Sequence, residues 1–501
     1  MKYFVFFIGG TGARVLTSFL HISAAGMIRM EDPIHLMLLD ADMENCACND
    51  AMALYRIYRT NYEKVHTPEV NKVLAEKRFQ AFYANLDLPN IVTPMNPKTA
   101  TLDLATAGGE GSKALKWFYT EQERGQNLSN GFYAHPNIGC IYFQDLGNRL
   151  DTYTRQIRNA LSKGEDVRVV ITGSMFGGTG AAGIPSVLKL IQRACSDGNL
   201  SQVQINQHLH FGGVLVTPYF KVAEPGEGES NLRINSDVFF NNTQSALNYY
   251  GFRYANDFES IYLVGQNGLQ LVNPVYEDGG TKQENKPHVV ELIAALGIKD
   301  FLQQTESTGL QVFPQILDIE ARNPVFSWDS LDSDLSDLGD MLRTQVLLKV
   351  VFGPYVERPR GFGKPGWYKA FRMDRPGRKE ELQSLMQYTD IFLDWIYKIQ
   401  YQLPDSGYGQ LKRDDRIALL GPPIEEIMMS GDDLRQDYLY THFAELLDDS
   451  ANPQNISYYY SSAKHLVVDV GTLGTADSSM PSLGSLGLAI QLFNQASKKI
   501  V

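Results

Sequence analysis

Residues 173–183 read GSMFGGTGAAG and follow the apolar run Val167–Ile171. A strand that turns through glycines into a helix gathers backbone N–H groups and the positive helix end at one spot, and such an arrangement binds phosphate. An earlier loop is of the same kind, because residues 7–14 read FIGGTGAR and follow the apolar run Tyr3–Phe6. Two such loops in one sheet predict a pocket that holds phosphates from two sides.

The glycine spacing argues against two common phosphate loops. Gly9, Gly10 and Gly12 do not follow the Gly-x-Gly-x-x-Gly pattern of dinucleotide-binding folds. Neither loop ends in the Gly-Lys-Ser/Thr of a Walker loop. A Rossmann-type dinucleotide enzyme is therefore the least favoured interpretation. For the later loop, one alternative to a phosphate site stays open. Its glycines could serve only the close packing of the helix against the strand.

The later loop resembles the Gly-Gly-Gly-Thr-Gly-Ser/Thr-Gly signature of the tubulin/FtsZ superfamily. Phe176 stands at the first glycine of that signature, and Ala181 and Ala182 stand at its Ser/Thr-Gly. The earlier loop is similar to the family's Gly-x-Gly-Gly-x-Gly-x-Asn, with Phe7 at the leading glycine and Arg14 at the asparagine. All of these differences lie inside the two loops that the family uses for phosphate.

Further segments follow in the order of the superfamily. Residues 40–42 (DAD) end an expected strand and are similar to the Thr-Asp-Ala-Gln of bacterial homologues, and residues 107–112 (AGGEGS) resemble the third phosphate loop. Glu229 and Arg233 keep the Glu-x-x-x-Arg spacing of the sugar-contacting region, and Gln266 or Asn267 is expected near the purine. The resemblance implies a pocket for GTP or GDP, with or without Mg²⁺. The nucleotide-contacting residues that it implies are Gly9, Gly10, Thr11, Gly12, Arg14, Asp40, Ala107, Gly108, Gly109, Gly177, Gly178, Thr179, Gly180, Glu229, Arg233 and Gln266.

The pattern of residues 1–270 predicts an α/β fold with a doubly wound, mostly parallel sheet, because short apolar strands alternate with helical stretches. The expected strands are 2–8, 34–40, 138–143, 167–173, 209–217 and 260–264. The expected helices are 12–27, 113–123, 180–196, 241–250 and 287–303. The resulting domains are a tubulin/FtsZ-like nucleotide-binding domain at 1–283, a central helix at 284–304 and a helix-rich α+β C-terminal domain at 305–501.

Asp329 and Asp332 are the candidate catalytic residues. Tubulin-like GTPases complete their active site with acidic residues from the next subunit, and these two keep the Asp-x-x-Asp spacing of that loop. A carboxylate that accepts a hydrogen bond from water orients it toward the phosphorus. Ser and Asp are also the usual residues at the start of a helix, so a purely structural role stays open.

Composition limits the other possibilities. The net charge of −12 and the pI near 5.3 argue against a nucleic-acid-binding surface. Four cysteines are too few for a disulfide scaffold, which favours free thiols in the cytoplasm. No apolar run is long enough for a membrane span.

Two interpretations of the family resemblance compete. The first is a GTP-binding protein, and possible GTPase, that assembles with itself head to tail into an oligomer or filament. The second is a non-polymerising nucleotide-binding regulator with a tubulin-like pocket. In either case the C-terminal domain is the candidate surface for a protein partner.

Overall fold

The computed structural model describes residues 1–68, 82–94, 100–105, 111–129, 131–197, 200–223, 236–254, 256–267, 270–273, 280–282, 285–304, 310–318, 326–327, 376–400 and 417–418, with residues 338, 341, 345 and 348. The chain forms two compact units. The first unit contains Met1–Phe19, Met30–Ala53 and Asn85–Glu320, and the second contains Leu20–Arg29, Leu54–Ala84 and Ala321–Val501.

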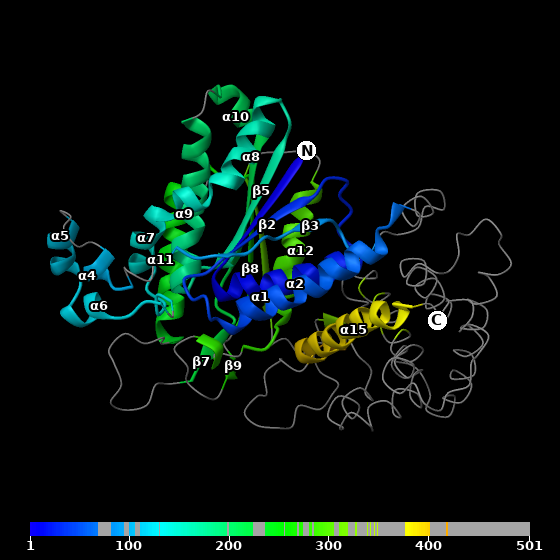
Figure 1. Ribbon diagram of the computed structural model, residues 1–501. Helices are drawn as coiled ribbons and strands as arrows, with labels where there is room; N and C mark the ends of the chain where they lie inside the picture. Colours follow the sequence, from blue (N-terminus) through cyan, green and yellow to red (C-terminus); the bar gives the residue numbers. More distant parts are fainter. Residues whose placement is uncertain are drawn as a thin grey trace. The chain divides into compact units, whose positions relative to one another are not determined.

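A parallel sheet forms the centre of the first unit (Figure 1). The order across its described strands is β10-β8-β6-β5-β1-β2-β3, with β4 also paired to β2, and every pairing is parallel. The chain builds outward from β1 in one direction and then, from β5, in the other. The predicted α/β class with a mostly parallel sheet is therefore confirmed, and the order is that of a doubly wound sheet. The strands are β1 (Lys2–Ile8), β2 (Ile34–Leu39), β3 (Leu86–Asp87), β4 (Ile91–Val92), β5 (Val167–Ser174), β6 (Leu209–Val216), β8 (Ser260–Asn267) and β10 (Gln311–Asp318).

Helices and two short strand pairs complete the described elements. Strand β7 (Phe220–Val222) pairs with β9 (Gln270–Asn273), and β11 (Phe326–Ser327) pairs with β12 (Ile417–Ala418). The α-helices are α1 (Gly9–Ala24), α2 (Cys46–Val65), α4 (Leu102–Ala105), α5 (Gly111–Phe118), α6 (Glu121–Gly125), α7 (Pro136–Phe143), α8 (Asp151–Ser162), α9 (Gly178–Ser196), α10 (Gln202–His208), α11 (Phe239–Arg253), α12 (Val289–Gln303) and α15 (Arg378–Gln400). The 3-10 helices are η2 (Gln144–Arg149), η3 (Ser236–Val238) and η4 (Gly280–Lys282).

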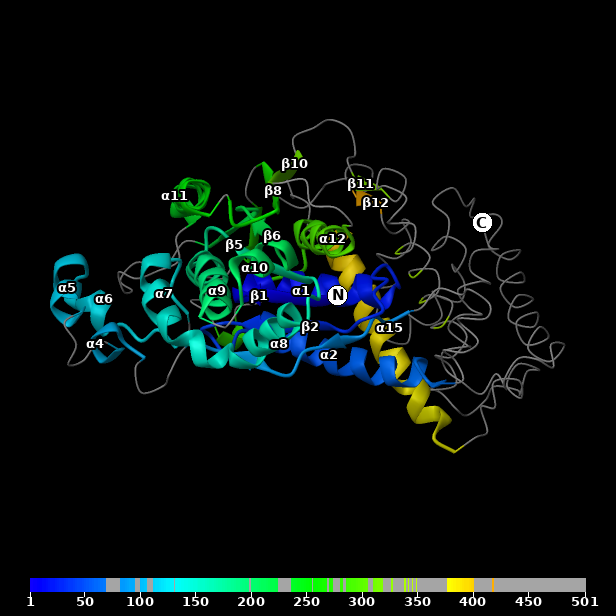
Figure 2. The same cartoon turned by 90° about the horizontal axis from the view of Figure 1, so that it is seen from above.

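Neighbouring residues of β1 face opposite layers of helices, because side chains alternate along a strand. The ring of Phe6 packs against Tyr153 of α8, and the ring of Phe7 packs against Phe19 of α1, with centroids 5.7 Å and 5.9 Å apart. Helices α9 and α12 likewise lie on opposite sides of β5 in both views (Figures 1 and 2). Since both faces are covered, the central strands read as continuous apolar runs.

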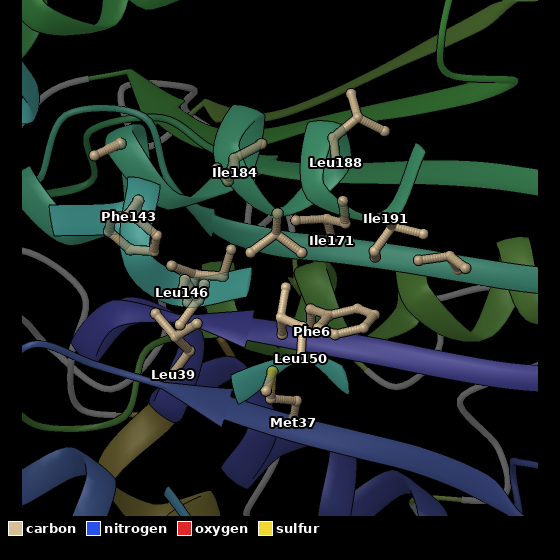
Figure 3. Packing of buried hydrophobic residues seen from close by; sticks show 14 of the residues in the cluster. Phe6, Met37, Leu39, Phe143, Leu146, Leu150, Ile171, Ile184, Leu188 and Ile191 are labelled. Atoms are coloured by element: carbon tan, nitrogen blue, oxygen red, sulfur yellow. The ribbon is translucent and has the colours of Figure 1, made fainter. Parts of the chain in front are cut away.

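An apolar cluster of buried side chains fills one side of this sheet (Figure 3). It joins the strands to the layer of helices that includes α7, α8 and α9, and its members are fully or nearly fully buried. The packed layer holds the ends of β1 and β5 in fixed positions for the loops that follow them. The labelled side chains are Phe6, Met37, Leu39, Phe143, Leu146, Leu150, Ile171, Ile184, Leu188 and Ile191.

Residues 138–143 were wrongly predicted as a strand. They form helix α7, which begins at Pro136, a residue well suited to the first helical position. Gly139 lets the helix approach α9, since a Cβ there would lie 2.7 Å from Cβ of Ala182. Short apolar runs do not distinguish a buried helix from a buried strand, which explains the error. The helix expected at 113–123 is two helices, α5 and α6, and Thr120 caps the second one.

An aromatic cluster lies in the second unit. His21 stacks on Trp395 with ring centroids 4.4 Å apart, and its Nδ1 lies 3.1 Å from the hydroxyl of Tyr388. Tyr388 also packs edge-on against Tyr83. The described part of the C-terminal region is mostly helical because of α15, as the sequence predicts.

Candidate functional site

The carboxyl ends of β1 and β5 border an open pocket with about 740 Å³ of empty space, a volume that includes solvent at its mouth. The doubly wound order changes direction between these two strands, and open α/β sheets bind ligands in the crevice at that point. The described lining residues are Gly9, Gly10, Thr11, Arg14, Asp40, Asp42, Asn45, Gly131, Phe132, Tyr133, Ala134, Ser174, Phe176, Gly177, Gly178, Thr179, Gly180, Phe220, Val222, Phe239 and Asn285.

The two glycine loops touch each other at this pocket. Gly9 leads β1 into α1 with a φ of +74°, a conformation that favours glycine. A Cβ on Gly9 would lie 3.3 Å from the backbone nitrogen of Gly180 and 3.4 Å from Cβ of Thr179. The first turns of α1 and α9 therefore open onto the same space, and their N–H groups have no partners within their own helices. This arrangement favours an anion between the two helix starts.

Helix α9 begins without a side-chain cap, since its N-cap residue is Gly177. A Cβ on Gly178 would lie 2.7 Å from Cβ of Phe132, and one on Gly180 would lie 2.5 Å from the carbonyl oxygen of Ser174. These glycines are thus needed for close packing, and they also leave the first-turn N–H groups open to the pocket. The two interpretations of this loop are compatible.

Asp40 and Asp42 place two buried carboxyl groups at the edge of the pocket, directly after β2. Burial raises the pKa of Asp40 to about 7, and it also raises the pKa of Asp42. Asp42 Oδ2 accepts a hydrogen bond of 2.6 Å from the backbone nitrogen of Gly280. Neither carboxylate pairs with a basic side chain among the described residues, so a cation beside them would be stabilised.

Arg14 is buried at the pocket and is held by the start of α12. Its Nε donates to Glu291 Oε1 at 2.6 Å, and its Nη2 donates to the hydroxyl of Tyr219 at 2.9 Å and to Thr11 Oγ1 at 3.1 Å. Glu291 Oε2 in turn accepts the backbone N–H of His288, the N-cap residue of α12. Burial by itself would lower the pKa of Arg14, but Tyr219 and Glu291 raise it, so the guanidinium stays charged.

An aromatic wall closes another side of the pocket. Phe176 packs against Phe239 and Phe220, with ring centroids 4.8 Å and 5.5 Å apart, and the guanidinium of Arg14 lies 5.4 Å from the Phe220 ring centroid. The bulky residue in the second glycine loop is therefore part of this wall. Its ring offers an apolar surface for a flat or apolar part of a ligand.

A strained turn faces the pocket from the segment before α7. Gly131, Tyr133 and Ala134 have positive φ values of 108°, 48° and 59°, and the N–H of His135 donates to the carbonyl of Phe132 at 2.7 Å. Positive φ at both central residues is typical of a type I′ turn, in which Asn and Gly are usual. Tyr and Ala at these positions cost about 1–3 kcal/mol each. Strain of this kind concentrates at functional sites.

The pocket brings together most of the described residues that the sequence singled out. Gly12 is outside its described lining, because it packs on the backbone of Phe7, and a Cβ there would lie 2.8 Å from the Phe7 carbonyl carbon. Gln266 is also outside that lining, and its Nε2 donates to the carbonyl of Tyr219 at 2.6 Å. The predicted residues that line the pocket are Gly9, Gly10, Thr11, Arg14, Asp40, Gly177, Gly178, Thr179 and Gly180. The predicted residues that lie outside the described part of the chain are Ala107, Gly108, Gly109, Glu229, Arg233, Asp329 and Asp332.

Sequence reasoning missed the side chains that reach the pocket from other segments. Asn45 and the turn at Tyr133 and Ala134 carry no motif that marks them. One sequence pattern could have indicated the position of Glu291 at the start of α12. A carboxylate three residues after the N-cap His288 fits a capping box. Its bond to Arg14 joins residues 277 positions apart, which no local pattern reveals.

Comparison with protein-family models and with curated proteins finds no match to this chain. In the part of the chain that the structure describes, no cluster of three or more His, Cys, Asp or Glu residues is arranged to hold a metal ion. Over the same residues, no helix is long and apolar enough to cross a membrane.

Proposed function

We propose that this protein binds GTP or GDP in the pocket between β1 and β5, as a tubulin/FtsZ-like nucleotide-binding protein. The observation that carries the proposal is the contact of the two glycine loops, in which a Cβ on Gly9 would lie 3.3 Å from the backbone nitrogen of Gly180. Two helix starts that meet in this way surround an anion with N–H groups from both sides. Their position at the switch point of a parallel sheet supports a nucleotide as the ligand.

The charges around the pocket favour a divalent cation as the companion of the phosphates. Arg14 is the one basic residue in the described lining, and Glu291 already neutralises it. Asp40 and Asp42 add two carboxyl groups without basic partners among the described residues. The described lining therefore has too little positive charge to neutralise a polyphosphate by itself. Mg²⁺ is commonly bound by one or two carboxylates together with phosphate oxygens, which fits these two residues. When bound there, it would neutralise phosphate charge.

Self-assembly and hydrolysis are the second half of the proposal. The resemblance implies a head-to-tail oligomer or filament in which Asp329 and Asp332 of one subunit orient water at the nucleotide of the next. The glycine loops at 7–14 and 173–183 contain no Asp, Glu or His that could act as a general base, which supports an active site that a second subunit completes.

A non-polymerising regulator with the same pocket is the second candidate. Phe176 in place of a loop glycine favours it, because its ring joins the aromatic wall beside the bound ligand. Such a wall stabilises binding whether or not hydrolysis follows.

One experiment tests the shared part of both candidates. The purified protein is denatured, and any released nucleotide is identified by mass spectrometry; calorimetry then compares GTP, GDP, ATP and NAD. We expect guanine nucleotides to be released and to bind. Binding of NAD alone would overturn the proposal in favour of a dinucleotide enzyme. Sedimentation with and without GTP separates the assembling protein from the regulator.

A further inference from the structure

Helix α11 presents an uncharged surface with large apolar side chains to solvent. The exposed fractions are 86% for Phe252, 55% for Phe240, 49% for Tyr249 and 37% for Leu247. Charged residues make up 20% of the chain, so about three would be average for the 15 residues of α11, but Arg253 is the single one. A surface that lacks charge and is rich in aromatic side chains is typical of the core of a protein–protein interface. The exposed polar residues of the helix are uncharged as well: Asn241, Gln244, Ser245 and Asn248.

The opposite side of α11 is anchored to the fold. Phe239 and Tyr250 are buried, and the Tyr250 hydroxyl donates to the carbonyl of Ala181 at 2.7 Å. Asn242 Nδ2 donates to the carbonyl of Phe176 at 3.2 Å. The helix lies at the periphery of the first unit (Figure 2). A helix that is fixed on one side offers its other side at little further cost in conformational freedom, which favours association.

Four residues of the exposed surface lie in one line along the helix, which we call the α11 seam. The seam consists of Phe240, Gln244, Leu247 and Gly251, with the alternating spacing of four and three residues that pairs helices. Gly251 leaves an open position in the seam, because nothing lies within 4 Å of a Cβ built on it. The seam therefore has a large ring near one end and an open position at the other.

We propose that the α11 seam pairs with the same seam of a second copy of this chain, in antiparallel orientation. A twofold axis between Gln244 and Leu247 sets Phe240 of each copy opposite Gly251 of the other. Large side chains then meet small ones, which is how facing helices fill the space between them. A parallel pair would bring the two Phe240 rings together and leave a gap between the two Gly251 positions.

Charges at the ends of the helix favour the same orientation. Asp237 is exposed just before α11, and Arg253 is exposed at its last residue. Antiparallel pairing brings Asp237 of each copy to the end where Arg253 of the other copy lies, whereas parallel pairing brings like charges together. A lipid surface is a poorer occupant, because helices that lie on membranes are rich in Lys and Arg on their polar face.

This contact goes beyond the proposed function and does not depend on it. No residue of the α11 seam lines the described pocket, so the pairing should be the same with GTP and with GDP. A contact that uses the same surface on both copies closes at the dimer, unlike a head-to-tail contact. A single helix pair is small beside the roughly 1,200–2,000 Å² of a stable interface, so we expect a dissociation constant on the order of micromolar.

Leu247→Lys tests the pairing by placing a charge at the centre of the seam in each copy. Sedimentation velocity over a concentration series, with GDP and with GTP, measures the dissociation constant of the dimer. We expect it to rise by about 10-fold or more, as for a central interface residue. Val203→Lys is the matched control, because Val203 is an exposed apolar residue on another helix, α10. The control should associate like the parent.

Gly251→Leu and Phe240→Ala test the antiparallel register. Leucine at position 251 has room in the single copy and favours the helix, so the variant should fold. In the dimer, however, it fills the position that Phe240 of the other copy takes. We expect Gly251→Leu to weaken the dimer by about 10-fold or more. Adding Phe240→Ala should restore it, because the small side chain then faces the large one.

The outcomes separate this contact from the other associations. A parent that is monomeric at every concentration overturns the pairing, and so does a dimer that Leu247→Lys leaves intact. A Gly251→Leu dimer that Phe240→Ala does not restore also overturns it, because the antiparallel register is then wrong. A parent that stays monomeric but sediments with phospholipid vesicles assigns α11 to a lipid surface instead. Growth beyond the dimer that requires GTP and survives Leu247→Lys belongs to the head-to-tail contact, so the two proposals fail independently.

Discussion

Arg14 Nε donates a hydrogen bond of 2.6 Å to Glu291 Oε1, and this bond ties the start of α1 to the start of α12. Both side chains are buried, and the Tyr219 hydroxyl donates to the same carboxylate oxygen at 2.5 Å. A buried ion pair is costly to break, because the remaining charge has no water to stabilise it.

Glu291→Gln should therefore lower the free energy of unfolding by about 3–5 kcal/mol, the usual cost of removing one partner of a buried ion pair. Urea denaturation followed by circular dichroism measures the change. Glu63→Gln is the control, because Glu63 is exposed and pairs with Arg59 only at the surface, at 3.2 Å. The control should change stability by less than about 1 kcal/mol. Equal effects of the two substitutions would contradict a special role for the buried pair.

Ala134→Gly should stabilise the protein by about 1 kcal/mol, because glycine adopts a positive φ without the steric cost that alanine meets. Gly164→Ala is the opposite control: Gly164 has a φ of +71° after α8 and no neighbour within 4 Å of a Cβ, so alanine should destabilise it. Thermal unfolding of the two variants checks the signs. A destabilised Ala134→Gly would mean that the turn is not strained.

Asp40→Asn should flatten the dependence of stability on pH between about 4 and 7. The pKa of Asp40 is raised to about 7 in the folded protein, whereas an unfolded aspartate has a pKa near 4. The folded state therefore binds more protons in this range, and stability falls as pH rises through the folded pKa. Each pKa unit corresponds to 1.36 kcal/mol, so the parent should lose up to about 4 kcal/mol across the window. Denaturation midpoints measured from pH 4 to pH 8 test this, and identical pH profiles of parent and variant would refute it.

Asp329→Ala and Asp332→Ala should lower GTP turnover by about 100-fold or more if these residues orient water, the lower range for general acid–base groups. Nucleotide affinity should stay nearly unchanged, because the groups act mainly in the transition state. Turnover per subunit should also rise with protein concentration, since the active site forms between subunits. A turnover number that is constant across the assembly range would reject the shared site.

The sequence predicted the strands near the pocket well and the packing around them poorly. The runs at 2–8 and 167–173 match β1 and β5 because buried parallel strands are apolar throughout and end at glycines. The strand prediction at 138–143 was wrong because Pro136 and the fit of Gly139 against Ala182 favour a helix. The fit of Gly139 is a tertiary contact, which a local sequence pattern does not show. Strand β10 was missed because it has polar and proline residues among its apolar ones.

The residues of the candidate site likewise fall into two groups, those that the sequence predicted and those that it did not. Glycine loops are visible in a sequence because backbone geometry demands particular residues there. Asn45 reaches the pocket through the cap of α2, and Glu291 reaches Arg14 across the fold, so neither could be predicted from local patterns.

The position of β1 at the middle of the sheet has a consequence for synthesis on the ribosome. Its neighbour on one side, β2, follows closely, but β5 leaves the ribosome about 160 residues later, roughly 10–30 s at 5–20 residues per second. During that interval one edge of β1 has no native partner, and an unpaired apolar strand edge is prone to aggregation. Nascent chains that end before residue 167 should therefore depend on chaperones, and those that include β5 should be released from them.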